Sequence, residues 1–424
     1  MTTSDSRSPA CARRMLTRGR SALFAAPLAL AFALMLATAS NATAAANAGG
    51  ADTGAEPAAR RAAADGVPSS RIVERRAGDD GPGTSRETSV IEEARRGYLT
   101  GYLDNDLFGG TDANYTNGVR LSWISEGEPL FDIFPARRQL EQLAGGAGDY
   151  KLIRAISGFD DESVRNGTLE LNYGLSLTQL MFTPDEPEAV SQPPGQRRYA
   201  GWLALGFSVH ARDHRALNSV ELLLGTTGPN SLAQEAQDLI HEIRDIEKFE
   251  GWDDQIPNEL TVDLSFTQKR RLRFLDRRET GFSIDGFSEW GARLGTYRTD
   301  AFFGGFFRAG FNLPADYSDP RITATAYSHK FFDDDQLAYQ PWSAYILFGF
   351  TGTGVAHDAS LDGPLFQDFD TGNEREPWRG ELFAGFGLRW QMVELSYVHT
   401  FRTQAYAEQD DSSDFGSLAL RVQL

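Results

Sequence analysis

The sequence predicts an all-β fold, a twelve-stranded antiparallel transmembrane β-barrel with a short helix in an extracellular loop. Three observations support it. The N-terminus resembles a secretory signal peptide, segments of alternating apolar and polar residues recur beyond residue 97, and the 424 residues include 42 Gly, 28 Phe, 13 Tyr and 7 Trp. Past the N-terminus no run of about 18 apolar residues indicates a spanning helix, and a barrel needs none because its strands are only half apolar.

Residues 1–44 have the three parts of a secretory signal peptide. Four arginines between positions 13 and 20 precede an apolar stretch over 22–39, and small residues around Ala44 and Ala46 suit cleavage. The alternative is a retained membrane anchor, which Pro27 and the many alanines disfavour. Loss of this segment, with its five arginines and one aspartate, would change the net charge from −18 to −22.

Residues 45–94 are rich in Ala, Gly, Arg and Asp and contain almost no aromatic residue, which predicts a disordered leader. The remainder, 95–424, is expected to form the outer-membrane barrel with its active-site loops. The single Cys11 lies in the signal segment, so the exported chain would contain no thiol. Disulfides and cysteine-bound zinc are therefore not expected.

The predicted strands are segments in which every second residue is apolar. In the clearest one, over 168–180, Leu171, Tyr173 and Leu175 share one face while Asn172 and Ser176 share the other. The segments lie near 97–106, 117–125, 168–181, 199–211, 218–226, 259–270, 286–298, 302–312, 342–354, 379–390, 392–402 and 414–424. Twelve is an even number, as a closed bacterial barrel requires.

A soluble β-sandwich with an apolar core would show the same alternation. The signal peptide, the strand length of about ten residues and the alternation of the last strand favour the barrel. That last strand ends in Leu424 and not in the aromatic residue common at the end of outer-membrane barrels.

The order of the strands assigns each connection to one side of the membrane. If the first strand rises from the periplasm, the outer connections are 107–116, 182–198, 227–258, 299–301, 355–378 and 403–413. The periplasmic side receives 126–167, 212–217, 271–285, 313–341 and a tight turn near Gln391. We expect short helices within 126–167.

A dense polar cluster over 103–118 joins the first two strands at their outer ends. One interpretation is a loop stiffened by the turn chemistry of Asn, Asp and Gly. The other is an oxygen-rich site for a hard cation such as Ca²⁺, formed by Asp104, Asp106 and Asp112 with the amide oxygens of Asn105 or Asn117. The spacing fits no EF-hand loop.

A helix is predicted in the outer connection over 231–248. Ser231 and Gln234 resemble a capping box, and apolar residues follow at helical spacing. His241 lies roughly 160° from the centre of the apolar stripe, at about 100° per residue. It is either a solvated histidine on a polar face or a general base that takes a proton from water. His357 and His399, also near the outer side, are reserve candidates.

The polar cluster resembles the opening signature of the lipid A 3′-O-deacylase family of outer-membrane barrels. The residues that carry it are the run 105–108 (Asn-Asp-Leu-Phe), Thr111-Asp112 and the run 115–118 (Tyr-Thr-Asn-Gly). Further matches are Phe182-Thr183-Pro184, Arg198-Tyr199-Ala200-Gly201-Trp202, Gly228-Pro229, Gly251-Trp252-Asp253, Leu361-Asp362-Gly363 and Phe415-Gly416-Ser417.

The resemblance implies an active site between the outer end of the barrel wall and the loop helix, with a Ca²⁺-assisted histidine mechanism. His241, Asn105 and Asp106 match the catalytic residues, and Asp106 with Asp112 would bind the metal. Thr116 and Asn117 are expected to contact the substrate. Strand parity adds that Asn105 faces the lipid, whereas Asp106 faces the lumen.

The expected function is therefore hydrolysis of the ester-linked 3′-acyloxyacyl chain of lipid A in the outer membrane of a Gram-negative bacterium. The alternatives are a non-catalytic barrel of the same family, which binds lipid or has a structural role, and a passive porin. The excess of 59 acidic over 41 basic residues disfavours nucleic acid as a partner. It also means that anionic lipid must be held locally, by Arg197, Arg198 and a bridging cation.

Overall fold

The computed structural model describes residues 97–106, 115, 117–126, 128–129, 158–160, 163, 169–245, 247–272, 281–317, 319–323, 341–410 and 412–424. The predicted signal peptide (1–44) and leader (45–94) lie outside these residues, as do most of the positions between 126 and 167 where short helices were predicted. None of the helices described is long and apolar enough to cross a membrane.

The described chain is dominated by antiparallel strands. They are β1 (Tyr98–Asn105), β2 (Asn117–Ile124), β3 (Glu128–Pro129), β4 (Glu170–Phe182), β5 (Ala200–Arg212), β6 (Ala216–Thr227), β7 (Leu260–Arg271), β8 (Phe282–Gly295), β9 (Arg298–Phe311), β10 (Trp342–Asp358), β11 (Trp378–Trp390), β12 (Val393–Arg402) and β13 (Ser413–Gln423). Four short helices lie between them: η3 (Gly228–Ser231), α6 (Ala233–Arg244), η4 (Gly251–Asp254) and α8 (Ala359–Asp362).

The strands close into a ring. Each pairs with its neighbour in the chain from β4 to β13, β13 pairs with β1, β1 with β2, and β2 with β4. The two-residue β3 also pairs with β4 and continues the line of β2, so the wall has twelve strands in the part of the chain that is described. The twelve-stranded barrel predicted from the alternation is confirmed.

The two faces of the wall have opposite chemistry. On β5, Leu205, Phe207 and Val209 are each more than 40% exposed, whereas the alternate residues Ser208 and His210 are buried. Most of the other strands repeat the pattern, with apolar side chains outward and mainly polar side chains toward the lumen. A soluble sandwich would bury the apolar face, so this arrangement excludes it and is that of a membrane barrel.

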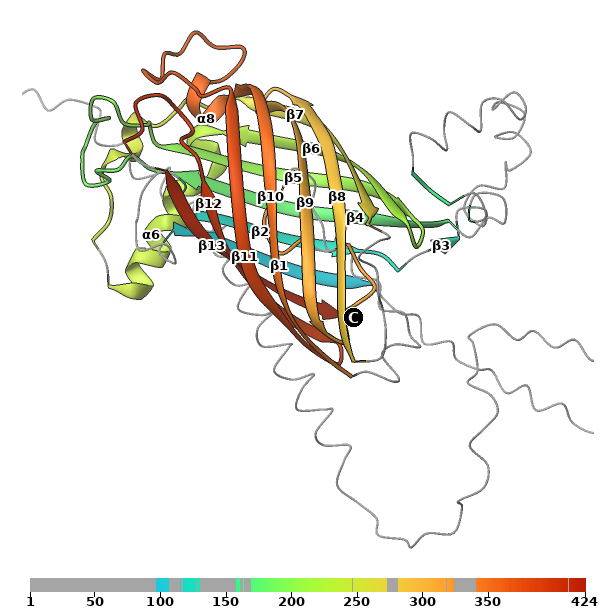
Figure 1. Ribbon diagram of the computed structural model, residues 1–424. Coiled ribbons are helices and arrows are strands. Elements are labelled where there is room, and N and C mark those ends of the chain that lie inside the picture. Colours follow the sequence, from blue (N-terminus) through green and yellow to red (C-terminus); the bar gives the residue numbers. More distant parts are fainter. Residues whose placement is uncertain are drawn as a thin grey trace, which may run out of the picture. The chain divides into compact units, whose positions relative to one another are not determined.

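The two ends of the barrel differ. Figure 1 shows α6 and α8 at one end, which we call the α6 end, and the C-terminus at the other, the C-terminal end. β1 finishes at the α6 end with Asn105, and β2 begins there with Asn117. The tight turn predicted near Gln391 joins β11 to β12 at the C-terminal end, where Gln391 has a positive φ of 50°.

Part of the connection between β9 and β10 lies inside the barrel. We call its described residues, 313–317 and 319–323, the lumen segment. Asp316 is fully buried, and its carboxylate pairs with Arg308 of β9 and lies 3.9 Å from Arg421 of β13. Arg321 pairs with Asp319 at 2.7 Å and with Glu381 of β11 at 3.0 Å. The sequence predicted only a periplasmic connection here.

Aromatic side chains pack around the lumen segment. Tyr317 contacts Phe287, which stacks on Phe306 with 4.7 Å between ring centroids, and the guanidinium of Arg321 lies 3.5 Å above the ring of Phe383. Burial lowers the pKa of Arg321, but the facing carboxylates of Asp319 and Glu381 outweigh it and hold the pKa above its ordinary value. The lumen toward the C-terminal end is thus packed, which disfavours a water-filled porin.

Arg308 is the residue on which the lumen segment depends most, because it is fully buried and pairs with both Asp285 and Asp316. Arg308→Met would leave Asp285 and Asp316 without their nearest cation, with Arg271 at 3.5 Å and Arg421 at 3.9 Å still beside them. We expect it to lower the free energy of unfolding by about 3–5 kcal/mol. Urea titration of the folded barrel in detergent measures this.

Lys248→Ala is the matched control, since Lys248 and Glu242 form an exposed pair 3.6 Å apart. Its effect should stay within about 0.5 kcal/mol. Equal effects of the two substitutions would contradict the role given to Arg308.

Candidate active site

A row of outward-facing residues crosses the wall at the α6 end. Asn105 on β1 pairs with Asn117 on β2, Asn117 pairs with Met181 on β4, and Met181 pairs with Gly201 on β5. By the alternation of each strand all four lie on the outward face. The prediction that Asn105 faces away from the lumen agrees with this register, and the neighbouring Asp104 is buried on the lumen side with Tyr115 donating to its carboxylate.

Helix α6 covers one end of this row. A side chain at Gly201 would collide with Ser231 and Ala233, so the absence of a side chain lets the start of the helix touch the wall. The side-chain amide of Gln179 donates to the carbonyl of Ser231 at 2.7 Å, and Trp252 Nε1 donates to Gln237 Oε1 at 2.6 Å. The first bond ties η3, which directly precedes α6, to β4, and the second ties α6 to η4, on the same side of the wall as Asn105.

His241 lies on α6 and is buried, with 6% of its surface exposed. The interpretation as a solvated histidine is therefore wrong: the polar face of the helix is covered by residues that follow it. Phe249 packs edge-on against the imidazole at 4.7 Å between ring centroids, and Nδ1 lies 2.7 Å from the carbonyl oxygen of Glu247. Because a carbonyl only accepts, Nδ1 carries the proton and Nε2 of the neutral ring is the basic nitrogen.

The helix is present as predicted, but its start is different. The N-cap is Leu232, in the left-handed conformation with φ of 58° and without a side-chain cap. The hydroxyl of Ser231 donates to the carbonyl of Gly228 and so stabilises η3 instead. The predicted capping box of Ser231 and Gln234 is therefore wrong, because η3 occupies the residues before the helix.

Oxygen atoms of the kind that bind hard cations lie beside the row. Asp106 follows β1 directly and is 1% exposed, and Asn117 Oδ1 is buried without a hydrogen-bond partner among the described residues. A carboxylate and an amide oxygen fit Ca²⁺ as part of a ligand set. No group of three or more His, Cys, Asp or Glu side chains suited to a metal occurs among the described residues, and Asp112 and Thr116 lie outside them.

The two arginines predicted to contact the substrate point in different directions. Arg198 donates to the carboxylate of Asp254 at 2.6 Å, beside η4 and near the α6 loop. Arg197 is buried, lies 4.2 Å above the ring of Phe182, and donates to Ser360 Oγ at 3.0 Å. Burial lowers the pKa of Arg197 from its ordinary value.

Among the reserve histidines, His399 belongs to the same outward row. It pairs across β12 and β13 with Gly416, and Gly416 pairs with Asn105. His399 Nε2 lies 2.9 Å from the carboxylate of Asp414. Strand register brings it to this row, which the sequence could not show. His357, the other reserve, lies instead against the backbone of Thr296.

These features define a membrane-spanning β-barrel with a polar site on the outward face of one end. The family model described as outer membrane protein LpxR matches residues 76–424. The chain therefore belongs to this family, the lipid A 3′-O-deacylase family predicted from the sequence motifs, and is an outer-membrane barrel.

One solved structure agrees with the fold. The LpxR structure from Salmonella typhimurium aligns with a TM-score of 0.58 and 14% identity, covering 77% of this chain and all of that one. The β domain of the Bordetella autotransporter BrkA aligns with a TM-score of 0.36 and 10% identity over 78% of this chain and all of that one. No curated protein sequence matches the chain.

Gly201→Val tests the contact between α6 and the wall. The added side chain would meet Ala233 and Ser231, and we expect the loop that carries α6 to become susceptible to protease while the barrel still folds. Limited proteolysis measures the first effect, and the mobility of unheated and heated protein in gels measures the second.

Gly380→Ala is the control, since its side chain would have only Thr403 at 3.5 Å as a close neighbour. If the α6 loop of Gly201→Val resists protease as well as that of wild type, the contact assigned between Gly201 and the start of α6 is contradicted.

Proposed function

We propose that the protein is a lipid A 3′-O-deacylase, an ester hydrolase that removes the 3′-acyloxyacyl chain of lipid A in the outer leaflet, with the α6 end facing outside the cell. The observation that carries the proposal is the outward row itself. Asn105 and Asn117 are adjacent on the lipid-facing side of the wall, and the helix bearing a buried histidine packs against the same side. A lipid in the membrane reaches this face directly.

The proposed base is His241. Its Nδ1 is occupied by the carbonyl of Glu247, which leaves Nε2 to take a proton from water as the water oxygen attacks the ester carbonyl. The bond between the carbonyl carbon and the sugar oxygen then breaks, and the same nitrogen returns the proton to the sugar oxygen. The products are a free fatty acid and a sugar hydroxyl, so atoms and charges balance.

The amides of Asn105 and Asn117 would orient the ester and the attacking water, since each carries donors and an acceptor at the outer rim of the wall. Asp106, Asp112 and Asn117 Oδ1 would hold Ca²⁺. The ion supplies positive charge for the oxyanion that develops on the carbonyl. The exposed Ile240 and Ile243 of α6 would contact acyl chains at the membrane surface.

The alternative is a non-catalytic barrel of the same family that binds lipid without cleaving it. The two functions share the outward row and differ in whether His241 transfers a proton. They therefore predict different masses for the lipid A of cells that produce the protein.

Mass spectrometry of lipid A from producing cells is the test. We expect loss of the 3′-acyloxyacyl chain with wild type, and a rate at least about 100-fold lower for His241→Ala, because a general base contributes about 10²–10⁴-fold. Asn105→Ala should also be slower, because it would no longer orient the ester and the water. His214→Ala, an exposed histidine in the turn between β5 and β6, should match wild type.

The requirement for the metal is tested by measuring the deacylase activity of the purified protein with and without a chelator. Activity should disappear on chelation and return with added Ca²⁺. An unchanged lipid A mass with folded wild type would favour the non-catalytic alternative, and full activity of His241→Ala would exclude His241 as the base.

A further inference from the structure

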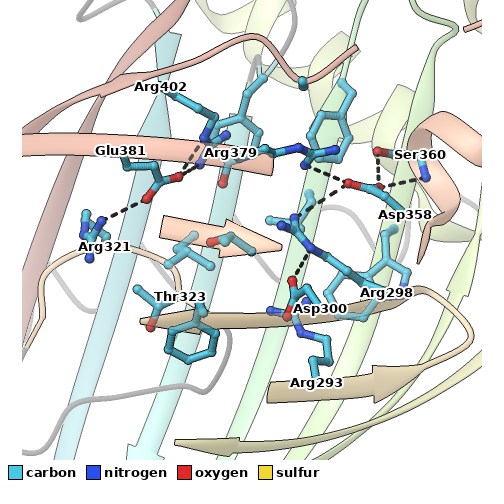
Figure 2. Close-up of a pocket in the computed structure, with 18 of the residues that line it drawn as sticks. Arg293, Arg298, Asp300, Arg321, Thr323, Asp358, Ser360, Arg379, Glu381 and Arg402 are labelled. Carbon is cyan, nitrogen blue, oxygen red and sulfur yellow. Dashed lines mark hydrogen bonds and ion pairs between the residues drawn. The ribbon is translucent and has the colours of Figure 1, made fainter. Parts of the chain in front are cut away.

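The lumen at the α6 end contains a cavity that the proposed hydrolysis does not use. It has a volume of about 150 Å³ and lies between the wall and the lumen segment. A site for one water needs roughly 10–15 Å³, so the cavity has room for several waters or one small ion. Figure 2 shows Arg298, Arg379 and Arg402 gathered in it around Asp358 and Glu381.

The charge of the lining is positive although the whole chain is acidic. Seven arginines and four carboxylates are found among the described residues that line the cavity, a formal excess of three positive charges. The arginines are Arg120, Arg197, Arg293, Arg298, Arg321, Arg379 and Arg402. Buried charge of one sign requires compensation, so the hydrogen bonds of these groups identify which of them lack it.

The four carboxylates are already paired. Glu381 accepts from Arg402 at 2.7 Å and Arg321 at 3.0 Å. Asp358 accepts from Arg379 at 2.9 Å, and Asp300 accepts from Arg298 at 2.5 Å. Glu289 lies 3.4 Å from Lys269, a cation outside the cavity lining. Two lining arginines have carboxylate partners outside the lining, Glu221 for Arg120 and Asp319 for Arg321. These pairs compensate Arg120, Arg298, Arg321 and Arg402, which leaves Arg379, Arg293 and Arg197 as the arginines of interest for a ligand.

Among the described residues that line the cavity, Arg379 has two buried nitrogens that lack a hydrogen-bond partner. Its side chain is 9% exposed, and only Nη1 is bonded, to Asp358. Nε and Nη2 are buried and have no hydrogen-bond partner among the described residues. These two nitrogens form the edge of the guanidinium that can donate two parallel hydrogen bonds to the oxygens of one carboxylate or phosphate.

Two further arginines strengthen the site. Arg293 Nε is also buried without a partner among the described residues. The hydrogen bonds of Arg197 go to neutral oxygens, the hydroxyl of Ser360 at 3.0 Å and its carbonyl at 3.4 Å. Neutral oxygens leave the positive charge of Arg197 uncompensated by those bonds.

We propose that this cavity binds a phosphate-class oxyanion, with Arg379 holding two of its oxygens through Nε and Nη2. The ligand is either free phosphate or the phosphate of a phosphorylated sugar such as a lipid head group, because both present the same oxygens. The site lies on the lumen side of the wall, opposite the outward row, and so it is independent of the proposed esterase activity.

Isothermal titration of the folded, detergent-purified barrel with inorganic phosphate is the test. We expect saturable binding by wild type and a Kd at least about tenfold weaker for Arg379→Gln, as loss of a charged hydrogen-bond pair predicts. Arg379→Lys keeps the charge but loses the paired Nε and Nη2 donors, so its Kd should fall between those of wild type and Arg379→Gln. Gel mobility before and after heating verifies that each variant is folded.

Arg389→Gln is the matched control. Arg389 is buried on the lumen face of the same strand, β11, but near the C-terminal end, so phosphate binding should be unchanged. His241→Ala should also bind phosphate normally, which separates this proposal from the esterase. Glucosamine 1-phosphate distinguishes the two possible ligands, with glucosamine as the control. If glucosamine 1-phosphate competes with inorganic phosphate for the site, the ligand is a sugar phosphate. If only inorganic phosphate binds, the ligand is the free ion.

Two results would overturn the proposal. One is the absence of phosphate binding by folded wild type at millimolar concentrations. The other is an unchanged Kd in folded Arg379→Gln, which would mean that the cavity arginines serve only to pair with the carboxylates around them.

Discussion

The closed ring of strand pairing decides where every side chain of this barrel lies. Once β13 pairs with β1 and β2 with β4, each residue faces either the lipid or the lumen, and its neighbours across the wall are determined. Asp104 and Asn105 show the effect, since consecutive residues serve opposite sides. Asp104 accepts a hydrogen bond from Tyr115 on the lumen side, whereas Asn105 joins the outward row. A shift of one residue in β1 would exchange the two.

The same constraint explains why the lumen is rich in charge. Many of the inward side chains are charged, and those that are buried are stabilised by one another or by the lumen segment. Arg308 with Asp285 and Asp316, and Arg321 with Asp319 and Glu381, are such sets. Toward the α6 end this compensation is incomplete, and Arg379 keeps hydrogen-bonding capacity that its neighbours do not use.

Much of the wall could be predicted from the sequence because a two-residue alternation survives in nearly every strand. The contacts between strands could not, since alternation contains no register. The adjacency of Asn105 and Asn117, and the place of His399 in the same row, follow only from the pairing. The helical pattern left open whether His241 is solvated, because Phe249 and Glu247 lie beyond the end of α6. Phe249 packs against the imidazole, and the carbonyl of Glu247 accepts from it. The lumen segment was missed because its charged residues resemble those of a solvated loop.

The lumen segment affects the charge that the wall presents to the lumen. β9 finishes with Phe311 and β10 begins with Trp342 at the same rim, the C-terminal end, and the lumen segment belongs to the connection between them. Its Asp316 meets Arg308 and Arg421 of the wall. The wall therefore presents two cations to this segment, and without it both would face an unfilled part of the lumen.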